Sequence, residues 1–322
     1  MDNRFLVADV GATHSRFALA DGQLLVSRVL RLPTLDHHEA ETLIAAARDG
    51  LGFDLLRGCC IAMAGPVQNG RGTITNATLE LDCDDLSARL GCPSAVVNDF
   101  FALARAVPEL KHLQQIGGGE SADGVRALLG PGSGLGMSVL IPAGQVNSPV
   151  VVLASEGGHA DMAPGSPLEM EVLQILGDRL PHVSWESVLS GPGLVNLYAA
   201  VCTVWGAKPE MVTAEWITAK GVNVDEPICH QVLELFFSFL GAAAGNLALT
   251  VCAEGGVYIG GGIVPAIVRA NVDFAAASPL RRRFEERGAL ADYAARIPLY
   301  VILDEDPGLL GALACLPFRP PR

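Results

Sequence analysis

The segment Phe5-Leu6-Val7-Ala8-Asp9-Val10-Gly11-Ala12-Thr13-His14 places an apolar, strand-like run directly before a short turn that contains glycine. A second strand-like run, residues 16–20, follows at once. Two short apolar runs separated only by turn residues are typical of neighbouring strands. The segment therefore predicts a β-hairpin near the N-terminus, with Asp9 at the entry to its turn.

Strand-like and helix-like segments then alternate along the first third of the chain. Strands are expected at residues 24–32, 59–64 and 95–97, and amphipathic helices at 37–48 and 84–90. Such alternation usually forms a parallel or mixed sheet with helices on its faces. The fold class expected from the sequence is therefore α/β.

The second half of the chain repeats the alternation with longer helices, and no repeat period stands out. Strands are expected at residues 125–129, 137–141, 150–154 and 299–303, and helices at 167–180, 194–204, 227–250 and 308–312. A chain of 322 residues exceeds the usual size of a single core, so two domains are expected. The boundary is expected near residues 106–109, with the glycine-rich segment 117–124 as a loop just inside the second domain.

The composition is that of a globular protein without nucleic acid or membrane as its main partner. The formal net charge is −13, so an anionic surface would be repelled. The densest basic segment, Arg281-Arg282-Arg283, stands near Glu285, Glu286 and Arg287 and is interpreted as a solvated helix face.

The eight cysteines include no Cys-x-x-Cys pair, and several lie in apolar runs. We interpret them as reduced core residues rather than as disulfides or a zinc site. The N-terminus has no signal-peptide pattern, and no apolar stretch reaches membrane-spanning length without a Gly, Pro or charge. A cytoplasmic, soluble protein is expected.

The segment Glu156-Gly157-Gly158-His159 follows a predicted buried strand. A carboxylate accepts hydrogen bonds from paired hydroxyls, an imidazole donates or accepts, and glycine lets the backbone come close to a ligand. The segment therefore suits recognition of a polyhydroxyl compound. The alternative is a turn in which both polar groups are only solvated.

Two further acidic positions have a structural and a chemical interpretation. Asn98 and Asp99 close a predicted strand before a helix, so Asp99 could be the helix N-cap. Alternatively, Asp99 is a general base that accepts a hydroxyl proton from a sugar during phosphoryl transfer, and Asn98 binds that sugar. Glu186, expected early in a helix, is either a capping or surface residue or part of the same site.

Three glycine-containing turns could approach a nucleotide. In Asp9–Thr13, backbone N–H groups and the Thr13 hydroxyl could face phosphate, and Asp9 could hold magnesium through water. Gly130-Pro131-Gly132-Ser133-Gly134-Leu135-Gly136 again joins two strands, and Gly260-Gly261-Gly262 ends a third. Ordinary hairpins and a tight strand-to-helix turn would give the same patterns.

Together these segments resemble the bacterial glucokinase family of actin-like, or ribonuclease H-like, sugar kinases. The matching segments occur in the family's order from Asp9 to Gly311 and cover essentially the whole chain. The resemblance implies a hexose bound by Asn98, Asp99, Glu156, His159 and Glu186, with Asp99 as the catalytic base toward the C6 hydroxyl.

The resemblance also implies ATP and Mg²⁺. The nucleotide would be bound by Asp9, Gly11, Ala12, Thr13, Gly132, Ser133, Gly134, Gly261 and Gly262, with Asp9 toward the metal. The implied fold has a small α/β domain, residues 1–108 plus about 304–322, a large α/β domain, residues 109–303, and an active-site cleft between them. Family members are commonly homodimers.

The first phosphate loop departs from the family pattern Asp-x-Gly-Gly-Thr-Asn, because Ala12 and His14 stand at its fourth and sixth positions. The zinc-binding cysteines of the related repressor, open reading frame and kinase family are missing. The function implied is phosphorylation of D-glucose by ATP. The alternatives are a kinase for mannose, fructose or glucosamine, another phosphoryl donor such as ADP or polyphosphate, and a glucose-binding sensor with a weakened nucleotide loop.

Overall fold

The chain divides into two compact units. The computed structural model describes residues 4–74, 79–144, 150–222, 226–271 and 277–316. The first unit is Met1–Lys111 with Asp304–Arg322, and the second is His112–Leu303. Residues 1–3 and 317–322, which the sequence assigned to the small domain, lie outside the described residues. The sequence placed the first change of domain slightly earlier, after residue 108.

The first unit is built on a five-stranded sheet in the order β3-β2-β1-β4-β8. Its strands are β1 Phe5–Val10, β2 His14–Ala20, β3 Leu30–Pro33, β4 Gly58–Met63 and β8 Ser94–Asn98. Strands β1, β2 and β3 pair antiparallel, whereas β4 and β8 continue the sheet in parallel beyond β1. The predicted N-terminal hairpin is confirmed. A small separate sheet contains β5 Val67–Gln68, β6 Arg71–Thr73 and β7 Glu80–Asp82.

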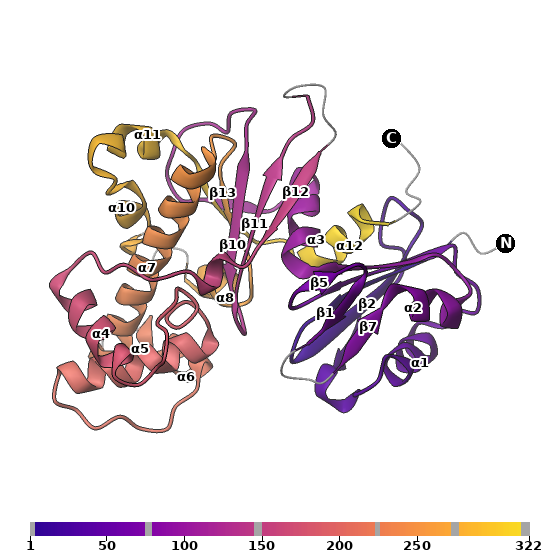
Figure 1. The fold of residues 1–322 in the computed structure, drawn as a ribbon, viewed down its shortest axis with the longest axis horizontal. Coiled ribbons are helices and arrows are strands. Elements are labelled where there is room, and N and C mark those ends of the chain that lie inside the picture. Colours follow the sequence, from indigo (N-terminus) through magenta and orange to yellow (C-terminus); the bar gives the residue numbers. More distant parts are fainter. Residues whose placement is uncertain (1–3, 75–78, 145–149, 223–225, 272–276, 317–322) are drawn as a thin grey trace. The chain divides into compact units, whose positions relative to one another are not determined.

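Strand β1 is buried on both faces because helices cover both sides of its sheet (Figure 1). Leu6 and Ala8 pack toward the helices α1 Ala40–Leu51 and α2 Cys83–Leu90. Phe5 and Val7 point the other way, toward the helices α3 Asp99–Ala106 and α12 Pro307–Ala314. The C-terminal helix therefore completes the core of the N-terminal unit.

The strand predicted at residues 24–32 is wrong over most of its length. Only Leu30–Pro33 forms β3, although an isolated bridge joins Ala20 to Leu25. Leu24 and Val26 are 65% and 51% exposed, so no neighbouring element covers their side chains. The predicted helix 37–48 starts later, at Ala40, because the 3-10 turn η1 Thr34–Asp36 precedes it.

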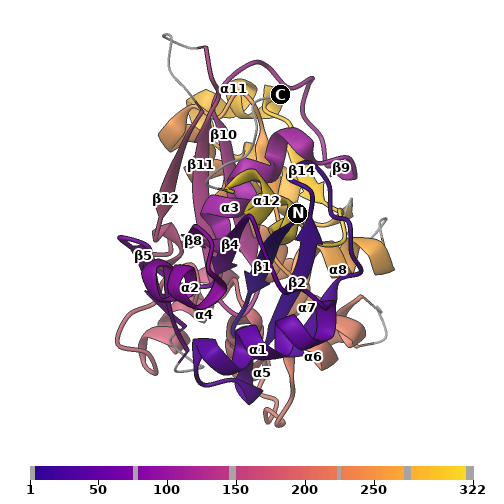
Figure 2. The ribbon, with the colours of Figure 1, turned by 90° about the vertical axis from the view of Figure 1, so that its right-hand side faces the viewer.

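The second unit contains a six-stranded sheet in the order β12-β11-β10-β13-β14-β9. Its strands are β9 Leu113–Gln115, β10 Arg126–Pro131, β11 Leu135–Ile141, β12 Val151–Ser155, β13 Val257–Ile259 and β14 Leu299–Ile302. Strands β10, β11 and β12 form an antiparallel meander, visible side by side in Figure 2, and β13 and β14 pair in parallel beyond β10. The sequence predicted all of these strands except β9, but it predicted β12 to be buried, whereas Val151 and Leu153 in this strand are exposed.

The two sheets share one plan: an antiparallel meander of three strands, then two parallel strands beyond its first strand. The turn between β1 and β2 therefore corresponds to the turn between β10 and β11. These are the first two glycine-containing turns predicted to approach phosphate. The duplication is one of strand order, which explains why no repeat period stands out in the sequence.

The described part of the second unit also contains several helices. They are α4 Pro167–Gly177, α5 Gly191–Val204, α6 Ala214–Gly221, α7 Pro227–Val251, α8 Ile263–Ala270, α10 Leu280–Glu285 and α11 Ala291–Arg296. Of these, α7 is packed against α5, α6 and α10. Short 3-10 turns are η2 Val107–Glu109, in the first unit, η3 Gly157–His159 and η4 Gly288–Leu290. The helix predicted at residues 227–250 is thus confirmed almost to the residue.

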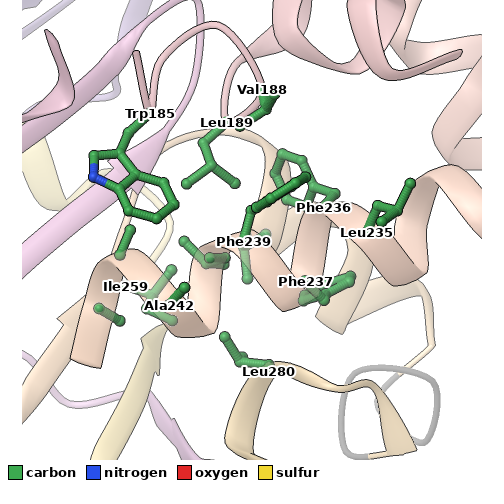
Figure 3. Packing of buried hydrophobic residues seen from close by; sticks show 14 of the residues in the cluster. Trp185, Val188, Leu189, Leu235, Phe236, Phe237, Phe239, Ala242, Ile259 and Leu280 are labelled. Carbon is green, nitrogen blue, oxygen red and sulfur yellow. The ribbon is translucent and has the colours of Figure 1, made fainter. Parts of the chain in front are cut away.

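Helix α7 is apolar all round because it is the core helix of the second unit. By length and composition it could cross a membrane, yet 78% of its most apolar window is buried inside the unit. Phe236 and Phe237 meet edge to face with ring centroids 5.7 Å apart, and Figure 3 shows them among Trp185, Leu189 and Leu280. Each fully buried Phe contributes about 1.5–3 kcal/mol to stability.

The interpretation of Arg281-Arg282-Arg283 as a solvated face is wrong for two of the three residues. Arg281 donates to the carbonyls of Ala295 and Ile297, each at 2.8 Å. Arg283 is 14% exposed and faces Glu169, whereas only Arg282 is largely exposed.

Arg287, on the segment after α10, is partly buried against α7. Its Nη2 donates to the carbonyls of Gly241 and Ala242 at 3.1 and 2.9 Å, and its burial lowers the pKa of its guanidinium. Glycines at positions 241 and 245 of α7 leave the room that α10 and Arg287 occupy. The basic segment therefore belongs largely to the interior of the second unit.

All eight cysteines are free thiols, as expected from the sequence. Cys59, Cys60, Cys92, Cys202 and Cys229 are buried. Burial raises the pKa of the Cys59 thiol, so this residue remains protonated and apolar. Cys252 departs from the prediction of core cysteines, because it is exposed where it ends α7.

Candidate active site

The first glycine-containing turn is a tight hairpin whose backbone is closed by a hydrogen bond from Gly11 N to the His14 carbonyl at 3.0 Å. Ala12 is absent from the described non-glycine residues with positive φ, which are Asn69 and Cys252. Its methyl group packs against the core of the first unit. An alanine therefore fits this turn without backbone strain, although the family pattern has glycine there.

A buried threonine that the sequence did not single out braces this turn from outside. Thr34 donates from Oγ1 to the Gly11 carbonyl at 2.8 Å and from its backbone N to the Thr13 carbonyl at 2.9 Å. The Ser15 hydroxyl lies 2.8 Å from the same Oγ1. The pairing of His14 with Pro33 between β2 and β3 brings these residues together. The role of Thr34 depends on this long-range pairing, so no local sequence pattern indicates it.

Asp9 sits at the end of β1 in a charged network. Its Oδ2 is 3.0 Å from Arg16 Nη1, and Arg16 and Arg31 both approach Asp306 at the start of α12. Burial raises the pKa of the Asp9 carboxyl, and the charge of Asp306 adds to this rise, while Arg16 opposes it. Gly308 has no side chain to collide with the Asp9 carboxylate.

The donor chemistry at Asp9 fits magnesium. Mg²⁺ keeps several waters and is commonly bound by one or two carboxylates plus substrate phosphates. Asp9 is 18% exposed at the edge of a turn and offers one such carboxylate.

Asp82, Cys83 and Asp84 have ligand atoms close enough together to hold a metal ion. In the described part of the chain, no other set of three or more His, Cys, Asp or Glu side chains does so. The Asp82 carboxylate, however, already caps α2 by accepting from the backbone N of Asp84 and Asp85. It also accepts from Arg71 Nε at 2.6 Å. A helix cap and an ion pair therefore account for this group.

Asn98 takes the capping role that the sequence offered to Asp99. Asn98, rather than Asp99, is the N-cap of α3, and its Oδ1 accepts from Phe101 N at 2.9 Å. The Asn98 amide nitrogen donates to the Gly65 carbonyl and to Asp99 Oδ1, each at 3.0 Å. Asp99 Oδ1 also accepts from Phe100 N at 2.9 Å. Asn98 thus fixes one oxygen of the Asp99 carboxylate.

The strand register brings the predicted residues of the first unit to one edge of its sheet. Val10 pairs with Met63, and Met63 pairs with Asn98, across the parallel strands β1, β4 and β8. The turn after β1 and the pair Asn98-Asp99 therefore lie at the same carboxyl edge, where open α/β sheets bind their ligands.

In the second unit, Gly157–His159 forms the 3-10 turn η3 after β12, and Glu156 is the residue that precedes this turn. The acid and the imidazole of the segment Glu156–His159 are both exposed, whereas Gly158 is buried. A Cβ on Gly158 would overlap the carbonyl oxygen of Leu135, so only glycine fits there. This close approach seats the segment on the first residue of β11.

Glu186 lies in a turn and not early in a helix, so that prediction is wrong. Helix α5 starts at Gly191, because Ser190 is its N-cap and accepts from Gly193 N at 2.9 Å. Glu186 donates from its backbone N to the Gly158 carbonyl at 2.8 Å, and its Oε1 is 3.9 Å from His159 Nε2. Its Oε2 accepts from Leu135 N at 2.7 Å. Glu186 is therefore neither a helix cap nor only a surface residue.

The second glycine-containing turn, between β10 and β11, meets the third at the edge of the sheet. Gly132 N donates to the Gly134 carbonyl at 2.8 Å, and Ser133 is exposed. Gly261 has φ +77°, and a Cβ there would overlap the Pro131 carbonyl. Gly262 precedes α8 with no side-chain cap and has open space around it. This backbone-lined edge, next to a helix N-terminus, suits an anionic ligand.

Two contacts that the sequence did not predict hold these turns together. Gly191 N, at the start of α5, donates to the Gly132 carbonyl at 2.8 Å. His182 Nε2 lies 3.0 Å from the His159 carbonyl oxygen. Both contacts join residues far apart in the sequence, so no local sequence pattern predicts them. The second unit thus brings all of its predicted site residues to the β10–β11 turn and its surroundings.

Comparison with known proteins shows the family of the chain. The model of the family described as Glucokinase matches residues 6–317. The chain belongs to the glucokinase family. Members of this family are ATP-dependent hexose kinases with the two-domain actin-like fold, and the chain is such an enzyme.

Relatives within the family match the chain over nearly its whole length. A glucokinase of Aromatoleum aromaticum is 42% identical over 319 residues, which cover 97% of this chain and 94% of the relative. A glucokinase of Nitrobacter hamburgensis is 40% identical, with 98% and 97% covered. The solved glucokinase of an Antarctic psychrotroph is 31% identical, has a TM-score of 0.82 and covers 98% of this chain and 99% of its own.

Proposed function

We propose that the chain transfers the γ-phosphoryl group of ATP to the C6 hydroxyl of D-glucose, giving glucose 6-phosphate and ADP. The observation that carries this proposal lies in the second unit. There, the carboxylate and imidazole side chains suited to hydroxyl groups stand beside glycine turns suited to phosphate. Glu186 touches both parts through its bonds to Gly158 and Leu135.

The sugar is held by Asn98, Asp99, Glu156, His159 and Glu186 in this proposal. Carboxylates accept hydrogen bonds from sugar hydroxyls, and the His159 ring can donate or accept. Asp99 takes the proton of the C6 hydroxyl as that oxygen attacks phosphorus, so it acts as the general base. The hydrogen bonds from Asn98 and Phe100 to Asp99 Oδ1 support this role, because they fix the carboxylate.

The nucleotide is held by the glycine turns: Asp9, Gly11, Ala12, Thr13, Gly132, Ser133, Gly134, Gly261 and Gly262. Backbone N–H groups and the two hydroxyls, Thr13 and Ser133, would donate to phosphate oxygens. Mg²⁺, when bound, neutralises charge that develops on the phosphates, and Asp9 is the residue that would hold it. Phosphoryl transfer needs little more from the protein than this positioning and charge neutralisation.

We also infer that the enzyme works in the cytoplasm as a homodimer, with neither nucleic acid nor membrane as a partner. The net charge of −13 supports the last point. The homodimer rests on the family resemblance alone. Light scattering on the purified enzyme should give the mass of two chains.

A sugar panel tests the proposed reaction directly. Purified enzyme with Mg²⁺ and ATP is given glucose, mannose, fructose or glucosamine, and ADP release is coupled to an optical assay. We expect glucose to give the highest kcat/KM, and ATP to surpass ADP and polyphosphate as donor. A higher kcat/KM for another sugar would replace glucose as the substrate.

The variant Ala12→Gly tests whether this alanine impairs ATP binding, as the glucose-sensor alternative requires. Since Ala12 has no positive φ, we expect glycine to leave the KM for ATP essentially unchanged. Stability should fall by about 0.4–1 kcal/mol, because glycine gains freedom in the unfolded chain. Steady-state kinetics and chemical denaturation measure both effects. A large fall in the KM for ATP would show that the methyl group obstructs the nucleotide.

The variant Thr34→Val tests the brace behind the same turn. Valine keeps the shape but leaves the Gly11 carbonyl and the Ser15 hydroxyl without their partner, which costs about 1–3 kcal/mol. We expect the KM for ATP to rise several-fold and the KM for glucose to change little. Thr34→Ser keeps the hydroxyl and serves as the control. Equal effects of the two variants would contradict a bracing role for this hydroxyl.

A further inference from the structure

One carboxylate links the predicted sugar residues to the second phosphate turn. Glu186 Oε2 accepts from Leu135 N at 2.7 Å, and Leu135 is the residue that follows the turn Gly132-Ser133-Gly134. The other oxygen of the same carboxylate, Oε1, faces His159 Nε2 at 3.9 Å. One carboxylate oxygen of Glu186 therefore lies beside the phosphate turn, and the other lies beside the sugar residue His159.

Backbone hydrogen bonds hold both Glu186 and the phosphate turn in place. Glu186 is anchored through its backbone N to the Gly158 carbonyl, and a Cβ on Gly158 would overlap the Leu135 carbonyl. The turn itself is held by the bond from Gly191 N to the Gly132 carbonyl. A hydrogen bond between a carboxylate and a backbone N–H is charge-assisted and about twice as strong as a neutral one. A shift of the Glu186 carboxylate therefore changes the hydrogen bond to Leu135 N and with it the position of the turn.

We propose that Glu186 is a positioning residue for the phosphate turn, and that it couples hexose binding to nucleotide binding. The inference rests on the proposed function, because it takes Glu186 Oε1 as a sugar contact and the turn as a phosphate contact. A hexose hydroxyl on Oε1 holds the carboxylate in the orientation in which Oε2 keeps Leu135 N in place. Binding of either ligand then strengthens binding of the other, since such coupling is reciprocal.

Glycines of the turn supply a first test that leaves Glu186 itself unchanged. A Cβ on Gly134 would lie 2.5 Å from Glu186 Oε2, whereas the nearest atom to a Cβ on Gly132 is Gly262 N at 3.9 Å. Neither glycine is among those with positive φ, so alanine suits the backbone at both positions. Gly134→Ala must displace the carboxylate, and Gly132→Ala is its matched control.

Calorimetry with glucose alone, without nucleotide, reads this first test. We expect Gly134→Ala to weaken glucose binding about tenfold or more, the equivalent of losing a hydrogen bond to a charged group. Gly132→Ala should bind glucose as the wild type does. Equal glucose affinities for the two variants would overturn Glu186 as a sugar contact, and the coupling with it.

The reverse test measures a non-hydrolysable ATP analogue with Mg²⁺ in the absence of sugar. We expect Glu186→Gln to weaken binding of the analogue, although this residue is not a phosphate contact, and Glu156→Gln to leave it unchanged. Adding glucose should tighten analogue binding at least about fivefold in the wild type and not in Glu186→Gln. Unchanged analogue binding by Glu186→Gln, with and without glucose, would overturn the inference.

These outcomes separate the coupling from the proposed function. Wild-type protein that binds neither glucose nor the ATP analogue would overturn the proposed function and the coupling with it. Wild-type protein that binds both ligands, with Glu186→Gln binding the ATP analogue as Glu156→Gln does, would overturn the coupling alone. Thermal unfolding of each variant checks that it is folded, and the two tests use different residues, so one misfolded variant leaves the other test decisive.

Discussion

Replacing Asp99 by Asn should lower kcat by at least about 100-fold while glucose still binds. Asparagine keeps an oxygen that can accept from Phe100 N and from the Asn98 amide, so the start of α3 should keep its structure. It cannot take up the proton of a hydroxyl group as a carboxylate does. The loss should therefore be confined to the chemical step, and it is measured by steady-state kinetics beside calorimetry with glucose.

A matched control removes an equal charge from the same unit. Asp85 lies in the first turn of α2 and pairs at the surface with Arg89 at 2.7 Å. Because exposed ion pairs contribute at most about 1 kcal/mol, Asp85→Asn should leave kcat and glucose binding as in the wild type. Undiminished turnover in Asp99→Asn would remove this residue from the role of base. Loss of glucose binding in Asp99→Asn would show that Asp99 acts mainly in binding the sugar.

The grouping of most candidate site residues could be predicted from the sequence, because most of them follow a strand, although Glu186, between α4 and α5, does not. The ends of parallel strands meet at one edge of a sheet, so residues placed just after such strands come together whatever separates them in the chain. This is why the turn after β1 and Asn98-Asp99 lie at the same edge. The same reasoning joins the β10–β11 turn to the glycines after β13.

Roles that depend on a side chain's partners could not be predicted in this way. Asn98 and Asp99 are both suited to cap a helix, and only the geometry shows that Asn98 does so. The Thr34 hydroxyl gains its role through the pairing of β2 with β3. Arg283 and Arg287 look like surface residues because their neighbours are charged, yet their partners come from α4 and α7.

Glu169 is a buried charged residue that joins three helices of the second unit. Glu169 lies in the first turn of α4 and is only 2% exposed. It accepts from Ser238 Oγ at 2.7 Å and from Gly165 N at 2.5 Å, and it faces Arg283 at 3.7 Å. A single carboxylate thus ties the start of α4 to α7 and α10. Removing one partner of a buried ion pair costs about 3–5 kcal/mol when the other charge is left uncompensated. Arg283 would keep Glu286 at 3.7 Å, so the lower end of this range applies.

Glu169→Ala should therefore lower the free energy of unfolding by about 3 kcal/mol or more, and the midpoint temperature by roughly 6–12 °C for a unit of this size. Glu169→Gln, which keeps a hydrogen bond from Ser238 but not the charge, should lose less, about 1–3 kcal/mol. The control is Glu171→Ala on the exposed face of α4, expected within about 0.5 kcal/mol of the wild type. Chemical denaturation of the three variants ranks them. If Glu169→Ala and Glu171→Ala unfold alike, the buried carboxylate does not hold α4 to α7 and α10.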